Sequence, residues 1–79
     1  MEIEVRLFAT FRDYLPAGGA GFAYKKVLNG QTTVQDVIDE LKLPADIPKI
    51  IILNGRHSNP DYVLKDGDIL SIFPPVAGG

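Results

Sequence analysis

One helical pattern among several short strand patterns constrains the fold more than any other feature of this sequence. Its apolar residues recur at i, i+3, i+4 and i+7, as on the buried side of an amphipathic helix: Val34, Val37, Ile38 and Leu41. Thr33 precedes them as a candidate N-cap, and Asp36 is a weaker substitute for the Glu or Gln of a capping box. Proline at 44 and 48 prevents the helix from continuing. A single helix can cover only one face of a sheet, so the other face stays largely open.

The remaining segments predict strands and turns. Residues 2–7 alternate between charged and apolar side chains, which is the pattern of a half-buried strand. We expect further strands at residues 22–28, 50–53 and 69–73, and a brief edge strand at residues 56–58. A short helical turn is expected at residues 9–15, before a glycine-rich loop at residues 17–21. The order is ββαβ(β)β in an α+β domain, with the first two strands in a long-looped hairpin and the first and last strands adjacent.

Size, charge and composition exclude several classes of function. A chain of 79 residues is one domain and buries only about 60% of its unfolded surface, which leaves little room for an internal active site. The net charge of −2 argues against a nucleic-acid partner, and cysteine is absent, so there is no thiolate metal site and no thiol nucleophile. No signal-peptide pattern and no apolar run of membrane-spanning length occur. We therefore expect a cytoplasmic protein with no membrane partner.

Polar residues give no catalytic constellation and no metal site. His57 is the only histidine and has no orienting partner nearby in the sequence, which favours a surface residue. Asp66 and Asp68 flank Gly67, but two carboxylates in a tight turn are too few for an EF-hand loop, so we interpret this segment as a turn.

Two aromatic residues are expected on the open face. If Ile3, Val5 and Leu7 face the helix, then Phe8 points outward, and the same alternation in the last strand turns Phe73 outward. Pairing of the two strands would join these rings in an exposed apolar patch, which is typical of a docking site. The alternative is that Phe73 tucks under the loop after residue 16 while Phe8 caps the edge of the core.

The end of the sequence predicts a stiff, projecting tail. We divide the chain into a folded domain at residues 1–73 and an extended, flexible diglycine tail at residues 74–79. Pro74 and Pro75 fix φ near the polyproline value, so the tail extends on the order of 20 Å beyond the domain. Gly78 and Gly79 have no Cβ and can pass through a narrow channel, which leaves the terminal carboxylate as the reachable group. A frayed terminus or a polyproline ligand is the alternative.

The ending at residues 73–79, Phe-Pro-Pro-Val-Ala-Gly-Gly, resembles that of the MoaD family, the small subunit of molybdopterin synthase. Leu7-Phe8-Ala9 followed by Arg12, Asn54-Gly55, and residues 64–68 also match, so the resemblance covers essentially the whole chain. The turn at residues 66–68 is shared with the thiamine-pathway carrier ThiS and with broader ubiquitin-like domains. The resemblance implies a ubiquitin-like β-grasp fold, with a mixed sheet of 4–5 strands and one main helix on one face. The connector at residues 44–48 and the loop at residues 17–21 depart from the family, and the role of that loop is open.

The resemblance also implies a mechanism. An E1-like adenylating enzyme would use ATP to activate Gly79, a sulfur donor protein would convert it to a thiocarboxylate, and the large subunit of molybdopterin synthase would receive the sulfur for dithiolene synthesis. The chain itself would be a non-catalytic carrier with no stably bound cofactor. Gly78 would thread the partner's channel, and the partner-binding residues would be Phe8, Phe73, Pro74, Pro75, Val76 and Ala77. A sulfur carrier for thiamine, tungsten cofactor or tRNA thiolation stays open, as does a ubiquitin-like modifier whose Gly79 forms an isopeptide with a lysine.

Overall fold

The computed structural model describes residues 1–16 and 21–75. One α-helix, one 3-10 helix and five strands make up this part of the chain. In chain order they are β1 (Glu2–Leu7), η1 (Ala9–Tyr14), β2 (Ala23–Val27), α1 (Val34–Leu41), β3 (Ile50–Leu53), β4 (Arg56–His57) and β5 (Ile69–Phe73). None of the helices in these ranges is long and apolar enough to cross a membrane.

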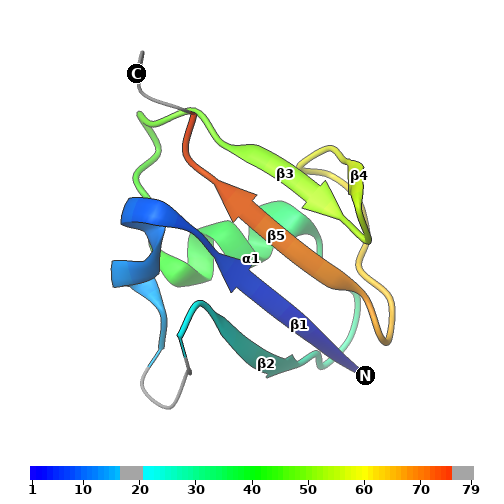
Figure 1. Ribbon diagram of the computed structural model, residues 1–79. Helices are drawn as coiled ribbons and strands as arrows, with labels where there is room; N and C mark the ends of the chain where they lie inside the picture. Colours follow the sequence, from blue (N-terminus) through cyan, green and yellow to red (C-terminus); the bar gives the residue numbers. More distant parts are fainter. Residues whose placement is uncertain (17–20, 76–79) are drawn as a thin grey trace.

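The strands form one mixed sheet in the order β2-β1-β5-β3-β4. β1 and β5 lie side by side at its centre and run parallel, whereas the other pairs are antiparallel. Helix α1 crosses one face of this sheet, and no other described element covers the opposite face (Figure 1). The arrangement confirms the predicted β-grasp fold, including the adjacency of the first and last strands.

Helix α1 begins at the predicted capping box. The Thr33 hydroxyl accepts a hydrogen bond from the Asp36 N–H at 3.1 Å, and the Asp36 carboxylate accepts one from the Thr33 N–H at 2.9 Å. Aspartate therefore closes the box as Glu or Gln would. The helix ends at Leu41, and its C-cap Lys42 takes a left-handed conformation with φ +60°, before the first of the two prolines.

The core lies between the sheet and α1. It is built from the alternating residues of β1, the inward residues of β3 and β5, and the apolar stripe of α1, as predicted. Phe11 of η1 is completely buried and closes one end of this core. The short helical turn expected after β1 thus has a packing role, because it carries the largest of the fully buried side chains.

The structure differs from the predictions at the ends of two strands and in the burial of one residue. β2 spans residues 23–27 rather than 22–28, and β4 ends at His57 rather than at Ser58. The alternation that turns Phe73 outward in β5 also places Ser71 on the outer face, but Ser71 is only 9% exposed. Its small side chain sits in the central strand, directly between Arg6 of β1 and Ile52 of β3, and the larger neighbours shield it.

Candidate docking surface and tail root

Two strand ends bring the predicted aromatic residues together. Leu7 and Ile72 pair in register, so Phe8 leaves β1 beside the point where Phe73 ends β5. The Phe8 N–H donates a hydrogen bond to the carbonyl oxygen of Ile72 at 3.3 Å. The rings of Phe8 and Phe73 stack almost in parallel, with centroids 4.1 Å apart and an interplanar angle of 7°. Strand register, set by the buried residues, therefore creates the contact.

A third ring extends this contact. Phe22, which immediately precedes β2, lies with its centroid 5.2 Å from that of Phe8 in a tilted arrangement. We call Phe8, Phe22 and Phe73 the aromatic cluster. The sequence pattern does not single out Phe22, because it reads as part of the strand itself, and only the antiparallel pairing of β2 with β1 brings it beside Phe8.

The cluster is more shielded than the sequence predicted. Phe8 and Phe73 are each half-buried, because each stacked ring covers one side of the other, while Phe22 is 42% exposed. Neither Phe8 nor Phe73 belongs to the buried core. The two rings were expected to be exposed and are half-buried, whereas their predicted adjacency is confirmed.

The outer face of the sheet is apolar next to the aromatic cluster. Ile50 of β3 pairs with Phe73 in register and is 36% exposed, and Ile52, two residues on, is half-buried on the same face. Apolar side chains thus extend from the cluster across β3, on the face opposite α1. Contiguous exposed apolar surface of this kind is a common feature of docking sites.

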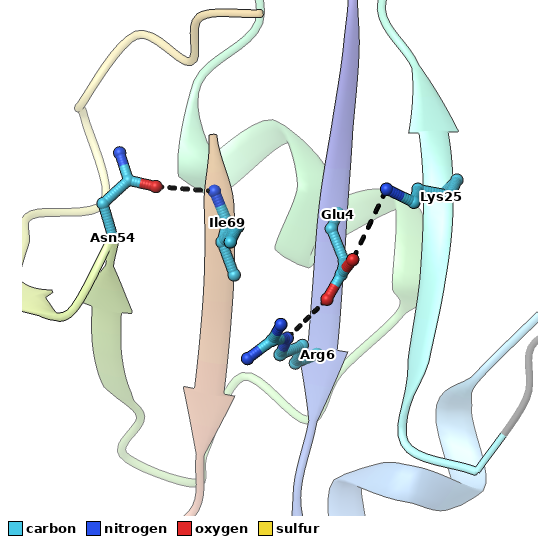
Figure 2. A network of polar contacts seen from close by, with 5 residues as sticks. All are labelled: Glu4, Arg6, Lys25, Asn54 and Ile69. Atoms are coloured by element: carbon cyan, nitrogen blue, oxygen red, sulfur yellow. Dashed lines mark hydrogen bonds and ion pairs between the residues drawn. The ribbon is translucent and has the colours of Figure 1, made fainter. Parts of the chain in front are cut away.

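The other part of this face is charged. The Glu4 carboxylate accepts a hydrogen bond from Nε of Arg6, and its second oxygen lies 3.4 Å from Nζ of Lys25 (Figure 2). The hydrogen bond from Arg6 is the main reason that the pKa of Glu4 is lowered from its usual value of 4.5. The outer face therefore combines an apolar region at the ends of β1 and β5 with a charged region farther back on β1 and β2.

The tail root follows directly from the central strand. β5 ends at Phe73, Pro74 is half-buried and Pro75 is exposed. The first proline is thus packed at the edge of the domain, and the second one is solvated. Val76, Ala77, Gly78 and Gly79 lie outside the described residues, and the roles assigned to all the site residues stay predictions.

The acidic turn before β5 uses its side chains for structure. Gly67 has φ +85°, which fits the predicted turn. Asp66 accepts a hydrogen bond from the first strand's backbone at 2.8 Å, and Asp68 accepts one from Asn54 at 2.9 Å and another within the turn at 2.8 Å. The Asn54 side-chain oxygen in turn accepts from the Ile69 N–H at 2.8 Å (Figure 2). These contacts tie the β3–β4 turn to the start of β5.

His57 lies exposed on the short edge strand β4. Within residues 1–16 and 21–75, no group of three or more His, Cys, Asp or Glu residues is arranged to hold a metal ion.

Comparison with known proteins identifies relatives over the whole fold. The model of the ThiS family matches residues 5–79. Small archaeal modifier protein 3 of Haloferax volcanii is 36% identical over an alignment of 96 residues that covers 100% of both chains.

Solved structures agree with this result. A candidate molybdopterin converting factor subunit 1 of Pyrococcus furiosus is 30% identical, with a TM-score of 0.74 over 95% of this chain and 98% of its own. In Helicobacter pylori, a complex of subunits 1 and 2 of the molybdopterin-converting factor contains a chain that is 28% identical. It has a TM-score of 0.62 and is matched over 100% of both chains.

Proposed function

Because this chain belongs to the ThiS family of ubiquitin-like sulfur carriers and modifiers, we propose that it carries sulfur as a thiocarboxylate on Gly79 for molybdopterin synthesis. Proteins of this family act as small carriers and not as catalysts. The chemistry of the chain would then reside in its terminal carboxylate, and the enzymes that act on it would be separate partners.

The proposed chemistry has two steps. A carboxylate is a poor electrophile because its charge is delocalised over two oxygens, so an E1-like enzyme first transfers AMP from ATP to Gly79 and releases pyrophosphate. A sulfide equivalent from a donor protein then attacks the acyl carbon. The new C–S bond forms as the C–O bond to AMP breaks, with no net change in oxidation state. The thiocarboxylate would be consumed by the large subunit of molybdopterin synthase.

One observation carries this proposal. Phe73 of the aromatic cluster ends β5 and directly precedes the tail root, so the surface that a partner would bind is joined to the reactive end by a short segment that begins with Pro74 and Pro75. A short stiff connection restricts where the end group can lie once the domain has docked, which lowers the entropy cost of reaching a distant active site. Gly78 would let the end pass through a channel too narrow for side chains.

The molybdopterin assignment draws on two of the relatives. One is described as subunit 1 of a molybdopterin converting factor, and the other is a chain from a complex of subunits 1 and 2 of such a factor. The paired prolines before the diglycine support the same pathway. A large-subunit partner for this chain is therefore part of the proposal.

A ubiquitin-like modifier is the second candidate, because the Haloferax volcanii relative is a small archaeal modifier protein. The activation step would be the same, but a lysine amine of a target protein would attack the adenylate, or a thioester derived from it. An isopeptide bond would then form in place of a thiocarboxylate. The two functions differ in the nucleophile and share the activated glycine.

Intact-mass analysis separates these functions. The full chain is incubated with ATP, the E1-like enzyme of the same organism and a sulfur donor. We expect exchange of one oxygen for sulfur at the C-terminus, and we expect the same chain without Gly79 to keep its fold but to acquire no sulfur. When the large subunit is added, the loaded chain should supply the sulfur for conversion of the cyclic pterin precursor. Conjugates of higher mass without any thiocarboxylate would reject the carrier in favour of the modifier.

A further inference from the structure

β2 leaves one edge of the sheet open. At the two ends of the β1–β2 pair, the Leu7 N–H donates to the carbonyl oxygen of Phe22 at 2.7 Å and the Leu28 N–H donates to that of Met1 at 2.8 Å, which fixes the hydrogen-bonding phase of the pair. Backbone groups alternate between the two sides of an antiparallel strand, so those of residues 23, 25 and 27 point away from β1. No described residue forms a hydrogen bond to them.

The opposite edge of the sheet offers fewer backbone groups for pairing with another strand. β4 consists only of Arg56 and His57, and very short edge strands are one way in which proteins avoid pairing with other chains. β2, with five residues, is long enough to act as a template for an added strand. In Figure 2, β2 is the outermost strand on its side of the sheet.

Two features next to β2 suit an added strand. The Lys25 side chain is 65% exposed and its ammonium group lies 3.4 Å from Glu4 on only one side, so it has room for a second carboxylate. On the other face, a cavity of about 330 Å³ opens between β2 and α1, with Lys26, Thr32 and Glu40 among its lining residues. A side chain of an added strand that points toward the helix can occupy this cavity.

Lys25 also disfavours pairing of β2 with a second copy of itself. The antiparallel register with the largest overlap is centred on residue 25, and it would place the two Lys25 side chains directly opposite each other. Like charges in opposite positions destabilise a strand pair, whereas opposite charges stabilise it. The edge is therefore matched to a different chain that carries an acidic residue at this position.

We propose that the open edge of β2 binds an extended segment of a partner protein as an added strand, with an Asp or Glu side chain opposite Lys25 and an apolar side chain opposite Val27. Val27 is 63% exposed on the same face as Lys25, so the partner's residue two positions from the carboxylate would cover it. This site is separate from the tail and does not depend on Gly79 being activated.

The test uses two blocked ten-residue peptides of alternating Val and Thr, one with a central Glu and one with a central Lys, titrated into the full chain. Amide NMR shifts should concentrate at residues 23–27, and hydrogen exchange at residues 23, 25 and 27 should slow. We expect the Glu peptide to bind about two- to fivefold more tightly than the Lys peptide, and Lys25→Glu to reverse this order. An unchanged preference in that variant would overturn the proposal.

A second pair of variants tests the backbone contacts. Val27→Pro removes an N–H that faces the open edge and takes no part in the β1–β2 pair, so the domain should fold while peptide binding is lost. Val27→Thr keeps this N–H and should still bind. Shifts centred on the aromatic cluster, absence of binding, or dimerisation of the free chain through β2 would each contradict the site. If Val27→Pro fails to fold, the charge reversal at Lys25 still decides the matter.

Discussion

At the scale of single residues, Tyr24 is the least satisfied group in the described part of the chain. Its side chain packs against the core from β2, and its hydroxyl is enclosed without a hydrogen-bond partner. Burial of the phenol, together with the nearby Glu40 carboxylate, raises the pKa of Tyr24 from 10.0 to about 12. Both effects favour the neutral form, so the fold opposes ionisation at this position.

This pKa predicts a loss of stability at high pH. Because the folded pKa exceeds the unfolded one, the folded chain holds a proton that the unfolded chain releases, and the stabilisation present below pH 10 is lost between pH 10 and 12. The free energy of unfolding of the Tyr24→Phe variant should fall less steeply in this interval, as measured by urea unfolding at several pH values. At neutral pH the variant should be unchanged or more stable by up to about 1 kcal/mol, because the lost hydroxyl had no partner. Identical pH profiles for the two chains would contradict this account.

At the scale of elements, residue patterns within a few positions predicted those features that depend on burial or backbone geometry over the same few positions. The alternation in β1, the i, i+3, i+4 spacing in α1 and the turn at Gly67 each reflect burial or backbone geometry within a few residues, and the structure agrees. The shielding of Ser71 and the position of Phe22 depend on strands that are distant in the sequence. No pattern within either segment encodes those neighbours, so they could not be predicted.

The capping box gives a prediction for α1. The helix has only eight residues, so a satisfied first turn is a large part of its own stability. Thr33→Ala should lower the free energy of unfolding by about 1 kcal/mol in urea denaturation. Thr32→Ala is the matched control: its hydroxyl donates to the Gly30 carbonyl in an exposed turn at 3.2 Å, and its loss should cost about 0.5 kcal/mol or less. Equal losses in the two variants would show that the cap is unimportant.

At the scale of the whole molecule, the sheet separates two kinds of surface. One face is closed by α1 and holds the core, whereas the outer face carries the aromatic cluster and the apolar residues of β3. The residue pattern predicts this division and the adjacency of Phe8 and Phe73. It does not include Ile50 and Ile52 in the docking surface, because a continuous apolar run does not indicate which residues face outward.

Two similar variants test the outer face as a docking surface. Ile50 and Val63 are 36% and 38% exposed, but only Ile50 lies beside Phe73, while Val63 pairs with Thr33 near the start of α1. Ile50→Ser should slow sulfur loading by the activating enzyme about tenfold at limiting concentration, equivalent to about 1.4 kcal/mol of binding. Val63→Ser should load normally although its loss of stability is similar. Equal loading of the two variants would move the docking surface elsewhere.

The central position of β5 also affects when, during synthesis, the sheet can form. β5 alone joins β1 to β3. A partly synthesised chain that does not yet include β5 therefore lacks the middle strand of its sheet. The parallel partner of β1 therefore becomes available only after the chain has been synthesised through β5. A partner that binds the stacked rings of Phe8 and Phe73 would therefore select folded chains, because this ring pair forms only when β1 and β5 lie in register.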